Sequence, residues 1–173
     1  MSKNLVLTGM MGVGKSTIGK SLADRLSFSF VDIDKLIETK EGSSINLIFR
    51  NKSENYFRRL ENIVSLEELK KSDSVISLGG GAFLNNAIRR AVKYSSVSFW
   101  LDVDINELTK RLNKTKRRPL LAGKNLKDNI NKIYLERKKT YNEADFKIKC
   151  TFLKSEEIVQ KIIKLYEDAR NQI

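Results

Sequence analysis

The feature that most constrains this chain is a glycine-rich turn placed directly after a short apolar run. The run NLVLT leads into GMMGVGKST, which fits the pattern G-x-x-x-x-G-K-[ST] with Gly9, Gly14, Lys15 and Ser16. In this pattern the glycines let the loop curl so that its backbone N–H groups point inward toward an anion. The segment therefore predicts a strand, an anion-binding turn and a helix, in that order.

Apolar runs and helical stripes continue to alternate along the rest of the chain. Ile18, Leu22 and Leu26 recur at four-residue spacing, which is typical of a helix with one buried face. Strand candidates lie at residues 4–8, 28–33, 74–78, 97–103 and 146–150. The alternation predicts an α/β fold, a three-layer α/β/α sandwich around a five-stranded parallel sheet, in a single domain spanning residues 1–173.

Composition excludes several kinds of chemistry. The chain has one cysteine, Cys150, and no histidine, which leaves no internal disulfide, Cys/His zinc site or Ser-His-Asp triad. The formal charge of +12 comes from scattered lysines, so we expect a basic cleft for anionic metabolites and no nucleic-acid partner, although a nucleic-acid binder remains the alternative. No apolar stretch approaches the roughly 18 residues of a membrane span, and we expect a cytoplasmic protein without a membrane partner.

The glycine-rich turn over residues 9–17 predicts how a nucleotide is bound. Its backbone, including Gly12, Val13 and Gly14, would surround the phosphates, and Lys15 would place a cation near the β- and γ-phosphates. The Ser16 hydroxyl is suited to ligate Mg²⁺, and Thr17 to reach the α-phosphate. The alternative is a turn that merely connects a strand to a helix.

Two carboxylates end the second predicted strand. Asp32 and Asp34 are two residues apart, so on a strand their side chains share one face at the carboxyl edge of the sheet, where ligands bind. Asp32 is suited to hold the water shell of Mg²⁺, and Asp34 to accept a hydrogen bond from a substrate hydroxyl. Capping of the next helix by Asp34 is the alternative.

The third predicted strand ends in three consecutive glycines, Gly79, Gly80 and Gly81. Such a run costs conformational entropy, so its position at another carboxyl end predicts a backbone brought close to a ligand. A loose turn is the alternative. Further on, the stretch TKRRPLLAGKN at 115–125 contains the only proline and clustered positive charge, which predicts a mobile surface loop acting as a lid.

Taken in order, several short strings give the chain a family resemblance. It resembles the shikimate kinases, small members of the P-loop fold shared with nucleoside-monophosphate kinases. Only the first string is specific alone, but the ordered set covers nearly the whole chain. The strings are GMMGVGKSTIGK, VDID, FRRLE, SLGGGA, RPLL and ERKKTY.

The resemblance implies roles for residues that the first pattern does not reach. It implies that Asp34 contacts the shikimate hydroxyls, that Arg58 and Arg137 bind the carboxylate, and that the three glycines line the same pocket. The expected substrate-binding region spans about residues 32–61. A guanidinium pair from two helices suits a small rigid acid because each fork matches a carboxylate. The alternatives are a surface pair of Arg58 with Glu61 and a solvated helix face for Arg137.

The resemblance also implies arginines on the nucleotide side. Arg118, before Pro119, would reach the phosphates when the lid closes, and Arg111 would lie near the adenine. Arg117, its neighbour in the sequence, leaves open which of the pair faces ATP.

The resemblance implies a shikimate kinase activity, the transfer of the γ-phosphoryl group of ATP, with Mg²⁺, to the 3-hydroxyl of shikimate in the biosynthesis of chorismate and aromatic amino acids. Lys15, Asp34 and Arg118 are the expected catalytic residues. The alternatives are another small-metabolite kinase, such as a gluconate or nucleoside-monophosphate kinase, and a GTP switch. The GTP switch is disfavoured because no N-K-x-D string is present. We expect the enzyme to be a monomer.

Overall fold

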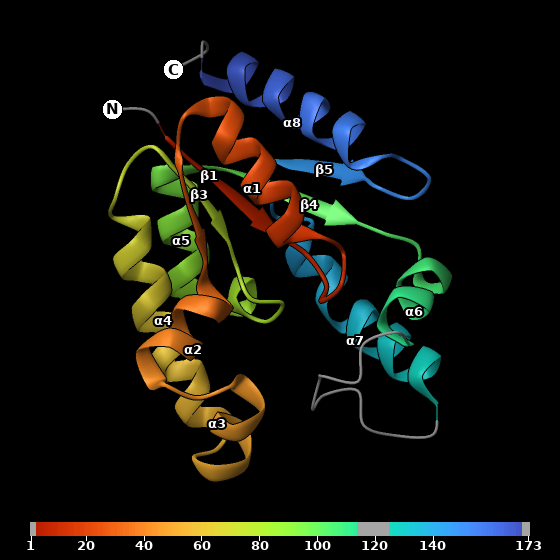
Figure 1. The fold of residues 1–173 in the computed structure, drawn as a ribbon. Helices are drawn as coiled ribbons and strands as arrows, with labels where there is room; N and C mark the ends of the chain where they lie inside the picture. Colours follow the sequence, from red (N-terminus) through yellow and green to blue (C-terminus); the bar gives the residue numbers. More distant parts are fainter. Residues whose placement is uncertain (1–2, 114–124, 171–173) are drawn as a thin grey trace.

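All strands of the described chain lie parallel in one sheet, as the alternation of runs predicts. The structure, a computed structural model, describes residues 3–113 and 125–170 (Figure 1). The strand order is β2-β3-β1-β4-β5. The predicted strand ranges are confirmed to within one residue at each end. The strands are β1 (Asn4–Thr8), β2 (Ser29–Asp32), β3 (Ser74–Ser77), β4 (Ser96–Asp102) and β5 (Phe146–Lys149).

Helices cover both faces of the sheet, which gives the predicted three layers. Helices α1 and α8 lie side by side on one face, and α4 and α5 cover the other (Figure 1). The helices are α1 (Lys15–Leu26), α2 (Ile33–Glu41), α3 (Ile45–Asn51), α4 (Glu54–Leu69), α5 (Asn86–Ser95), α6 (Ile105–Asn113), α7 (Leu126–Tyr141) and α8 (Ser155–Arg170), with a 3₁₀ turn η1 (Ala82–Leu84).

The central strands form the core. Leu5, Leu7, Val75, Ile76 and Phe99 have no exposed surface. Strands that are buried on both faces need apolar side chains at successive positions and not at alternate ones, which explains their continuous apolar runs. The site at the end of these strands therefore rests on a rigid base.

The strand order places three predicted motifs next to one another. Strands β2, β3 and β1 are neighbours, with Asp32 paired to Ser77 and Leu7 to the same Ser77. Because parallel strands end at one edge of a sheet, the turns after these three strands lie side by side. The glycine-rich turn, the Asp32–Asp34 segment and the glycine triplet consequently meet at the carboxyl edge.

The backbone of the Asp32–Asp34 segment differs from the prediction. Strand β2 ends at Asp32, and Asp34 lies in the first turn of α2. The carboxylate of Asp32 accepts a hydrogen bond from the Lys35 N–H at 3.3 Å and caps this helix, whereas the sequence offers Asp34 as the capping alternative. The expectation that both side chains share one strand face is therefore wrong, because the chain turns into a helix between them.

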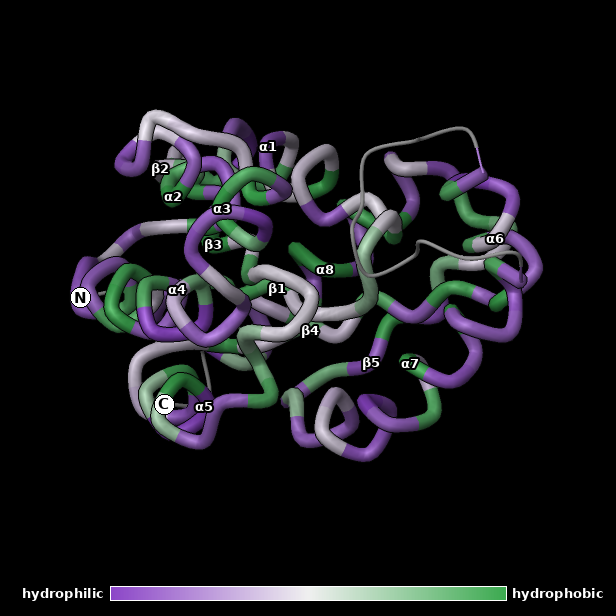
Figure 2. The backbone as a smooth tube through the Cα atoms, turned by 90° about the horizontal axis from the view of Figure 1, so that it is seen from below, coloured by the Kyte–Doolittle hydropathy of each residue, from purple (hydrophilic) through white to green (hydrophobic). Residues whose placement is uncertain are grey.

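Helices beyond the carboxyl edge flank the site on two sides. Viewed from below, α2 and α3 lie on one side of the strand ends and α6 on the other (Figure 2). The helix α3 had no counterpart among the predicted elements. The predicted lid at 115–125, with Arg117 and Arg118, lies outside the described residues apart from Asn125. Within the described ranges, no helix has the length and apolar character needed to cross a membrane.

Candidate active site

The turn after β1 has the backbone geometry that the glycine pattern predicts. Gly9 and Gly14 adopt φ values of 135° and 101°, a region that other residues rarely occupy. A Cβ on Gly9 would also lie 2.6 Å from the Leu101 carbonyl oxygen of β4. Since Gly14 is the N-cap of α1, the helix starts directly at Lys15, and its positive end faces the turn.

Lys15 folds back over this turn. Its side chain is buried, and Nζ donates hydrogen bonds to the carbonyl oxygens of Gly9 at 2.9 Å and Met10 at 3.0 Å. The backbone thus fixes the ammonium group at the loop, where the sequence pattern predicts a phosphate-binding cation.

Ser16 and Asp32, the two predicted magnesium ligands, are in direct contact. The Ser16 hydroxyl donates a hydrogen bond to Asp32 Oδ2. Both line a cavity of about 190 Å³ together with Gly12, Gly14 and Thr17. A hydroxyl and a carboxylate beside a phosphate-binding turn are hard oxygen donors, so these residues fit Mg²⁺.

Arg111 lies beside the same turn, on α6. Its Nη1 donates to the Val13 carbonyl oxygen at 3.5 Å, and its Nε pairs with Glu107 at 3.0 Å. The structure therefore brings Arg111 next to the phosphate loop.

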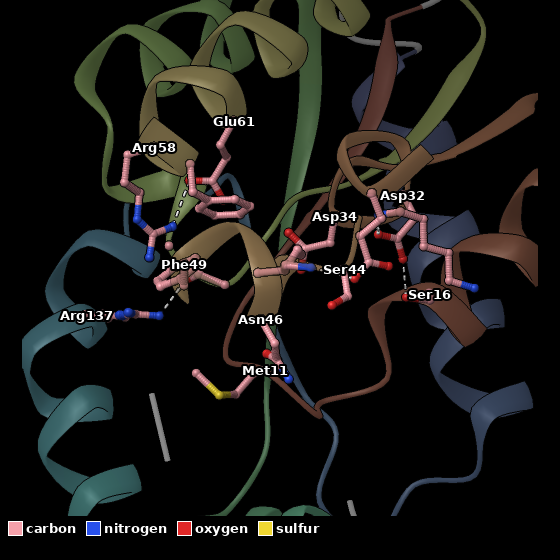
Figure 3. Close-up of a pocket in the computed structure, with 16 residues that line it drawn as sticks. Met11, Ser16, Asp32, Asp34, Ser44, Asn46, Phe49, Arg58, Glu61 and Arg137 are labelled. Atoms are coloured by element: carbon pink, nitrogen blue, oxygen red, sulfur yellow. Dashed lines mark hydrogen bonds and ion pairs between the residues drawn. The ribbon is translucent and has the colours of Figure 1, made fainter. Parts of the chain in front are cut away.

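A larger cavity of about 630 Å³ adjoins the phosphate side. Ser16, Asp32 and Asp34 line both cavities, so they form the junction between them. Figure 3 shows Ser16 and Asp32 at one end of the larger cavity and the two predicted acid-binding arginines, Arg58 and Arg137, at the other. Asp34 lies between the two ends.

Arg58 reaches the cavity from α4 and is held by two carboxylates of its own helix. Nη1 donates to Glu61 Oε2 at 2.8 Å, and Nε and Nη2 donate to Glu54 Oε1 at 3.3 and 3.1 Å. Burial alone would lower the pKa of Arg58, but the two carboxylates outweigh it and raise the pKa above its ordinary value. The Glu61 pair is thus present, and Arg58 also lines the cavity, so the surface-pair alternative does not account for it alone.

Arg137 reaches the cavity from α7. Its Nη1 donates to the Gly80 carbonyl oxygen at 2.9 Å, and only 9% of the residue is exposed. The alternative of a solvated helix face is therefore wrong. The two arginines come from different helices, and both line the same end of the cavity (Figure 3).

The glycine triplet leaves room for the functional side chains. A Cβ on Gly81 would lie 2.5 Å from Arg58 Nη1, and one on Gly79 would lie closer than 3.0 Å to oxygens of both Glu61 and Asp34. Gly80 contributes its carbonyl oxygen to Arg137. Gly80 and Gly81 line the larger cavity, whereas Gly79 lies behind it, against the two carboxylates. A loose turn is excluded by these close approaches.

Glu61 is the most buried acid of the site, with 3% of its surface exposed. Burial raises the pKa of Glu61, the pairing with Arg58 opposes this, and the nearby Asp34 adds to the rise, so that the pKa lies above its ordinary value. Glu61 therefore holds Arg58 in place at an electrostatic cost.

The sequence did not single out the wall of the cavity formed by α3. Phe49 packs against Phe57 of α4 with ring centroids 5.0 Å apart, and the Arg58 guanidinium lies over the Phe57 ring. The sequence contains a signal for this helix, because the N-cap residue Ser44 is followed by Ile45, Ile48 and Phe49 at helical spacing. The other lining residues that were missed are Met11, Lys35, Glu38, Ser44, Ile45 and Asn46.

Similarity to known proteins extends over nearly the whole chain. The family model described as shikimate kinase matches residues 11–167. A shikimate kinase from Sulfurihydrogenibium sp. is 41% identical over 161 residues, which cover 93% of this chain and 96% of that protein. The structure of a shikimate kinase from Acinetobacter baumannii in complex with shikimate superimposes with a TM-score of 0.93 at 30% identity, covering 98% of this chain and 96% of that one.

A kinase for the alternative acceptor, gluconate, is structurally less similar to this chain. A gluconokinase from Sinorhizobium meliloti superimposes with a TM-score of 0.58 at 12% identity, a level that reflects a shared fold. The superpositions on the Acinetobacter baumannii shikimate kinase and on the gluconokinase confirm the predicted P-loop kinase fold. The match to the shikimate kinase family model confirms the resemblance drawn from the ordered strings. The chain belongs to the shikimate kinase family.

Proposed function

We propose that this chain transfers the γ-phosphoryl group of ATP to the 3-hydroxyl of shikimate through the residues that line its two joined cavities. The observation that carries the proposal is their arrangement: a phosphate-binding turn at one end, two arginines at the other, and Asp34 between them. The products are shikimate 3-phosphate and ADP.

At the acid end, Arg58 and Arg137 bind the carboxylate of shikimate. Two guanidinium groups from different helices fix both the position and the plane of a carboxylate. Glu61 keeps Arg58 directed at the cavity, with an N–O distance of 2.8 Å. The apolar wall of Phe49 and Phe57 strengthens these charge contacts because it excludes water.

In the middle, Asp34 accepts a hydrogen bond from the acceptor hydroxyl. Its place in the first turn of α2 directs it to the junction of the two cavities, where the hydroxyl oxygen meets the γ-phosphate. Asp34 orients this oxygen for in-line attack and takes up its proton as the new P–O bond forms and the bond to ADP breaks.

At the phosphate end, the backbone of Gly12, Val13 and Gly14 donates to the phosphates, and Lys15 neutralises charge on the transferred group. Thr17 lines the phosphate cavity beside Ser16. Ser16 and Asp32 would hold Mg²⁺, which would neutralise phosphate charge when it is bound. Arg111 flanks the nucleotide from α6.

Arg118 is proposed to complete the phosphate end when the 115–125 segment closes, although it lies outside the described residues. Replacing it tests the choice between the neighbouring arginines. Arg118→Ala is expected to lower kcat by about 10²-fold, as for loss of one donor to the transferred group. Arg117→Ala serves as the control and should lower kcat far less. The reverse ranking would transfer the role to Arg117.

We further propose that the chain acts as a single-domain monomer in the cytoplasm, without a nucleic-acid partner. The support for a monomer is that the phosphate-binding turn, Asp34 and the arginine pair already form the proposed site, which needs no residue from a second copy. The support for the absence of a nucleic-acid partner is that the positive charge comes from scattered lysines. Light scattering at assay concentration tests the monomer, and salt-dependent binding to DNA or RNA would contradict the last point.

A side-by-side assay tests the acceptor. ADP release is measured with shikimate, gluconate, AMP or no acceptor, and the phosphorylated carbon is identified by NMR. The rate of ADP release with shikimate is expected to be about 10²-fold or more above the rate with any other acceptor, because the other acceptors leave the arginine pair or Asp34 without a hydrogen-bond partner. Lys15→Ala, with kcat expected to be about 10²- to 10³-fold lower, is the low-activity control. An equal rate with shikimate and with no acceptor would overturn the proposal.

A further inference from the structure

Two residues of helix α7 donate to the same backbone oxygen at the edge of the acid site. Arg137 Nη1 lies 2.9 Å from the Gly80 carbonyl oxygen, and the Tyr141 hydroxyl donates to that oxygen as well. Residues four apart lie above one another on one helix face, so both side chains reach one acceptor. A carbonyl oxygen has two lone pairs, and each donor takes one.

The two donors differ in what surrounds them. Tyr141 is fully buried, its ring centroid lies 5.9 Å from that of Trp100, and its hydroxyl oxygen lies 4.0 Å from the Met10 sulfur. Burial also raises the pKa of Tyr141, so its hydroxyl remains a donor at neutral pH. Arg137 instead lines the cavity, where its guanidinium can meet a ligand. Tyr141 is therefore the member of the pair whose surroundings do not change when a ligand binds.

We propose that the Tyr141 hydroxyl is a positioning group for acid binding, which fixes the Gly80 carbonyl and through it the guanidinium of Arg137. The proposal rests on the proposed function, since Arg137 is taken to bind the substrate carboxylate. Tyr141 does not line the cavity and acts only through the backbone.

A purely structural role for the hydroxyl makes a different prediction. If it only satisfied a buried carbonyl, its removal would lower the stability of the fold and leave the affinity for the acid unchanged. Gly80 keeps Arg137 as a donor when the hydroxyl is lost, so Tyr141→Phe leaves this oxygen with a partner. The phenylalanine ring also preserves the packing against Trp100.

The test compares Tyr141→Phe with a matched control, Tyr166→Phe. Tyr166 is equally buried and donates its hydroxyl to a backbone carbonyl, that of Lys3, at the amino end of the sheet and away from the site. Steady-state kinetics give KM for shikimate and ATP separately. Tyr141→Phe is expected to raise KM for shikimate about 3- to 10-fold, the size of one hydrogen bond, with KM for ATP and kcat within about 2-fold. Tyr166→Phe should change neither KM.

The double variant Tyr141→Phe/Arg137→Ala tests the route through Arg137. Once the guanidinium is gone, loss of the hydroxyl should raise the shikimate KM by less than about 2-fold, because the two residues act in series. An equal effect with and without Arg137 would overturn the proposal. So would an unchanged shikimate KM in Tyr141→Phe, or a melting temperature far below that of Tyr166→Phe, which would make the hydroxyl structural.

Measurement of the wild type distinguishes failure of the Tyr141 proposal from failure of the proposed function. A wild type that does not phosphorylate shikimate would contradict the proposed function. A wild type that does so, with Tyr141→Phe indistinguishable from Tyr166→Phe, would contradict the role of Tyr141 alone.

Discussion

The phosphate end of the site is made from one continuous stretch of chain, whereas the acid end is assembled from several distant elements. Lys15 and Ser16 follow directly on the turn after β1, and their placement depends on backbone geometry. Arg58, Arg137 and the glycine triplet come from α4, α7 and the end of β3, and they meet only because these elements pack together. The first end is a local motif, and the second depends on the tertiary fold.

This difference implies that substitutions should separate cleanly by ligand. Changes at the phosphate end should impair phosphoryl transfer and leave acid binding intact. Changes at the acid end should weaken acid binding and leave phosphoryl transfer intact. Changes at the glycine triplet should act by displacing the neighbouring side chains, such as Arg58.

The largest effect is expected at Lys15. Lys15→Ala removes the ammonium that neutralises charge on the transferred group, so kcat should fall about 10²- to 10³-fold. Lys20→Ala, which removes an exposed lysine of the same helix, is the charge-matched control and should retain wild-type kcat. The shikimate dissociation constant, measured by calorimetry without nucleotide, should stay the same in both. A matching loss of shikimate affinity in Lys15→Ala would remove the distinction between the two ends.

The next effect is expected at Arg137. Arg137→Ala leaves the substrate carboxylate without one of its two guanidinium partners, which should weaken shikimate binding about 30-fold or more, corresponding to about 2 kcal/mol or more. The exposed Arg59 offers the control Arg59→Ala, which should bind shikimate as the wild type does. Calorimetry provides both constants, and KM for ATP should be unchanged. Similar affinities in the two variants would show that Arg137 does not contact the acid.

A smaller effect is expected at Gly81. The backbone there has φ −105° and accepts alanine, but the new Cβ would lie 2.5 Å from Arg58 Nη1 and displace the guanidinium. Gly81→Ala should therefore raise KM for shikimate about 10-fold, the low end for disturbing a charged contact, while the melting temperature changes little. A large fall in melting temperature with unchanged KM would place the role of Gly81 in folding instead.

The smallest effect concerns Glu61 and the pH dependence of stability. The folded pKa of Glu61 is raised above 4.5 by burial, so the folded state binds this proton more tightly than the unfolded state. The contribution of this proton to the free energy of unfolding is fully present below pH 4.5 and is lost as the pH rises through the raised pKa of the folded state. Glu61→Gln should lack this decline. Urea unfolding of both proteins across this pH range measures it, and parallel curves would contradict the assigned shift.

The sequence predicted the local end of the site more completely than the assembled one. The turn at Gly9–Gly14 and the placement of Lys15 follow from neighbouring residues, so no tertiary information was needed. The strand ranges were also predictable, because parallel strands buried on both faces leave continuous apolar runs. The position of Asp34 was not, since the strand turns into a helix at Asp32 without any breaker residue.

Residues of the acid end were identified by family resemblance, but their contacts depended on packing. The charged stretch around Arg137 favours a solvated helix, and only the packing of α7 on the Gly80 turn buries it. In the same way, the burial of Gly79 against Glu61 and Asp34 joins three elements that are far apart in the sequence. The wall at Phe49 was missed although apolar residues follow Ser44 at helical spacing, because a pattern confined to a seven-residue helix is weak.

The most direct test of the two-ended site is a crystal structure of this chain with shikimate and a non-hydrolysable ATP analogue bound together. The account predicts that the carboxylate lies between Arg58 and Arg137, with the 3-hydroxyl beside Asp34 and facing the γ-phosphate position above Lys15. A shikimate carboxylate bound elsewhere, with both arginines turned away from it, would contradict the account.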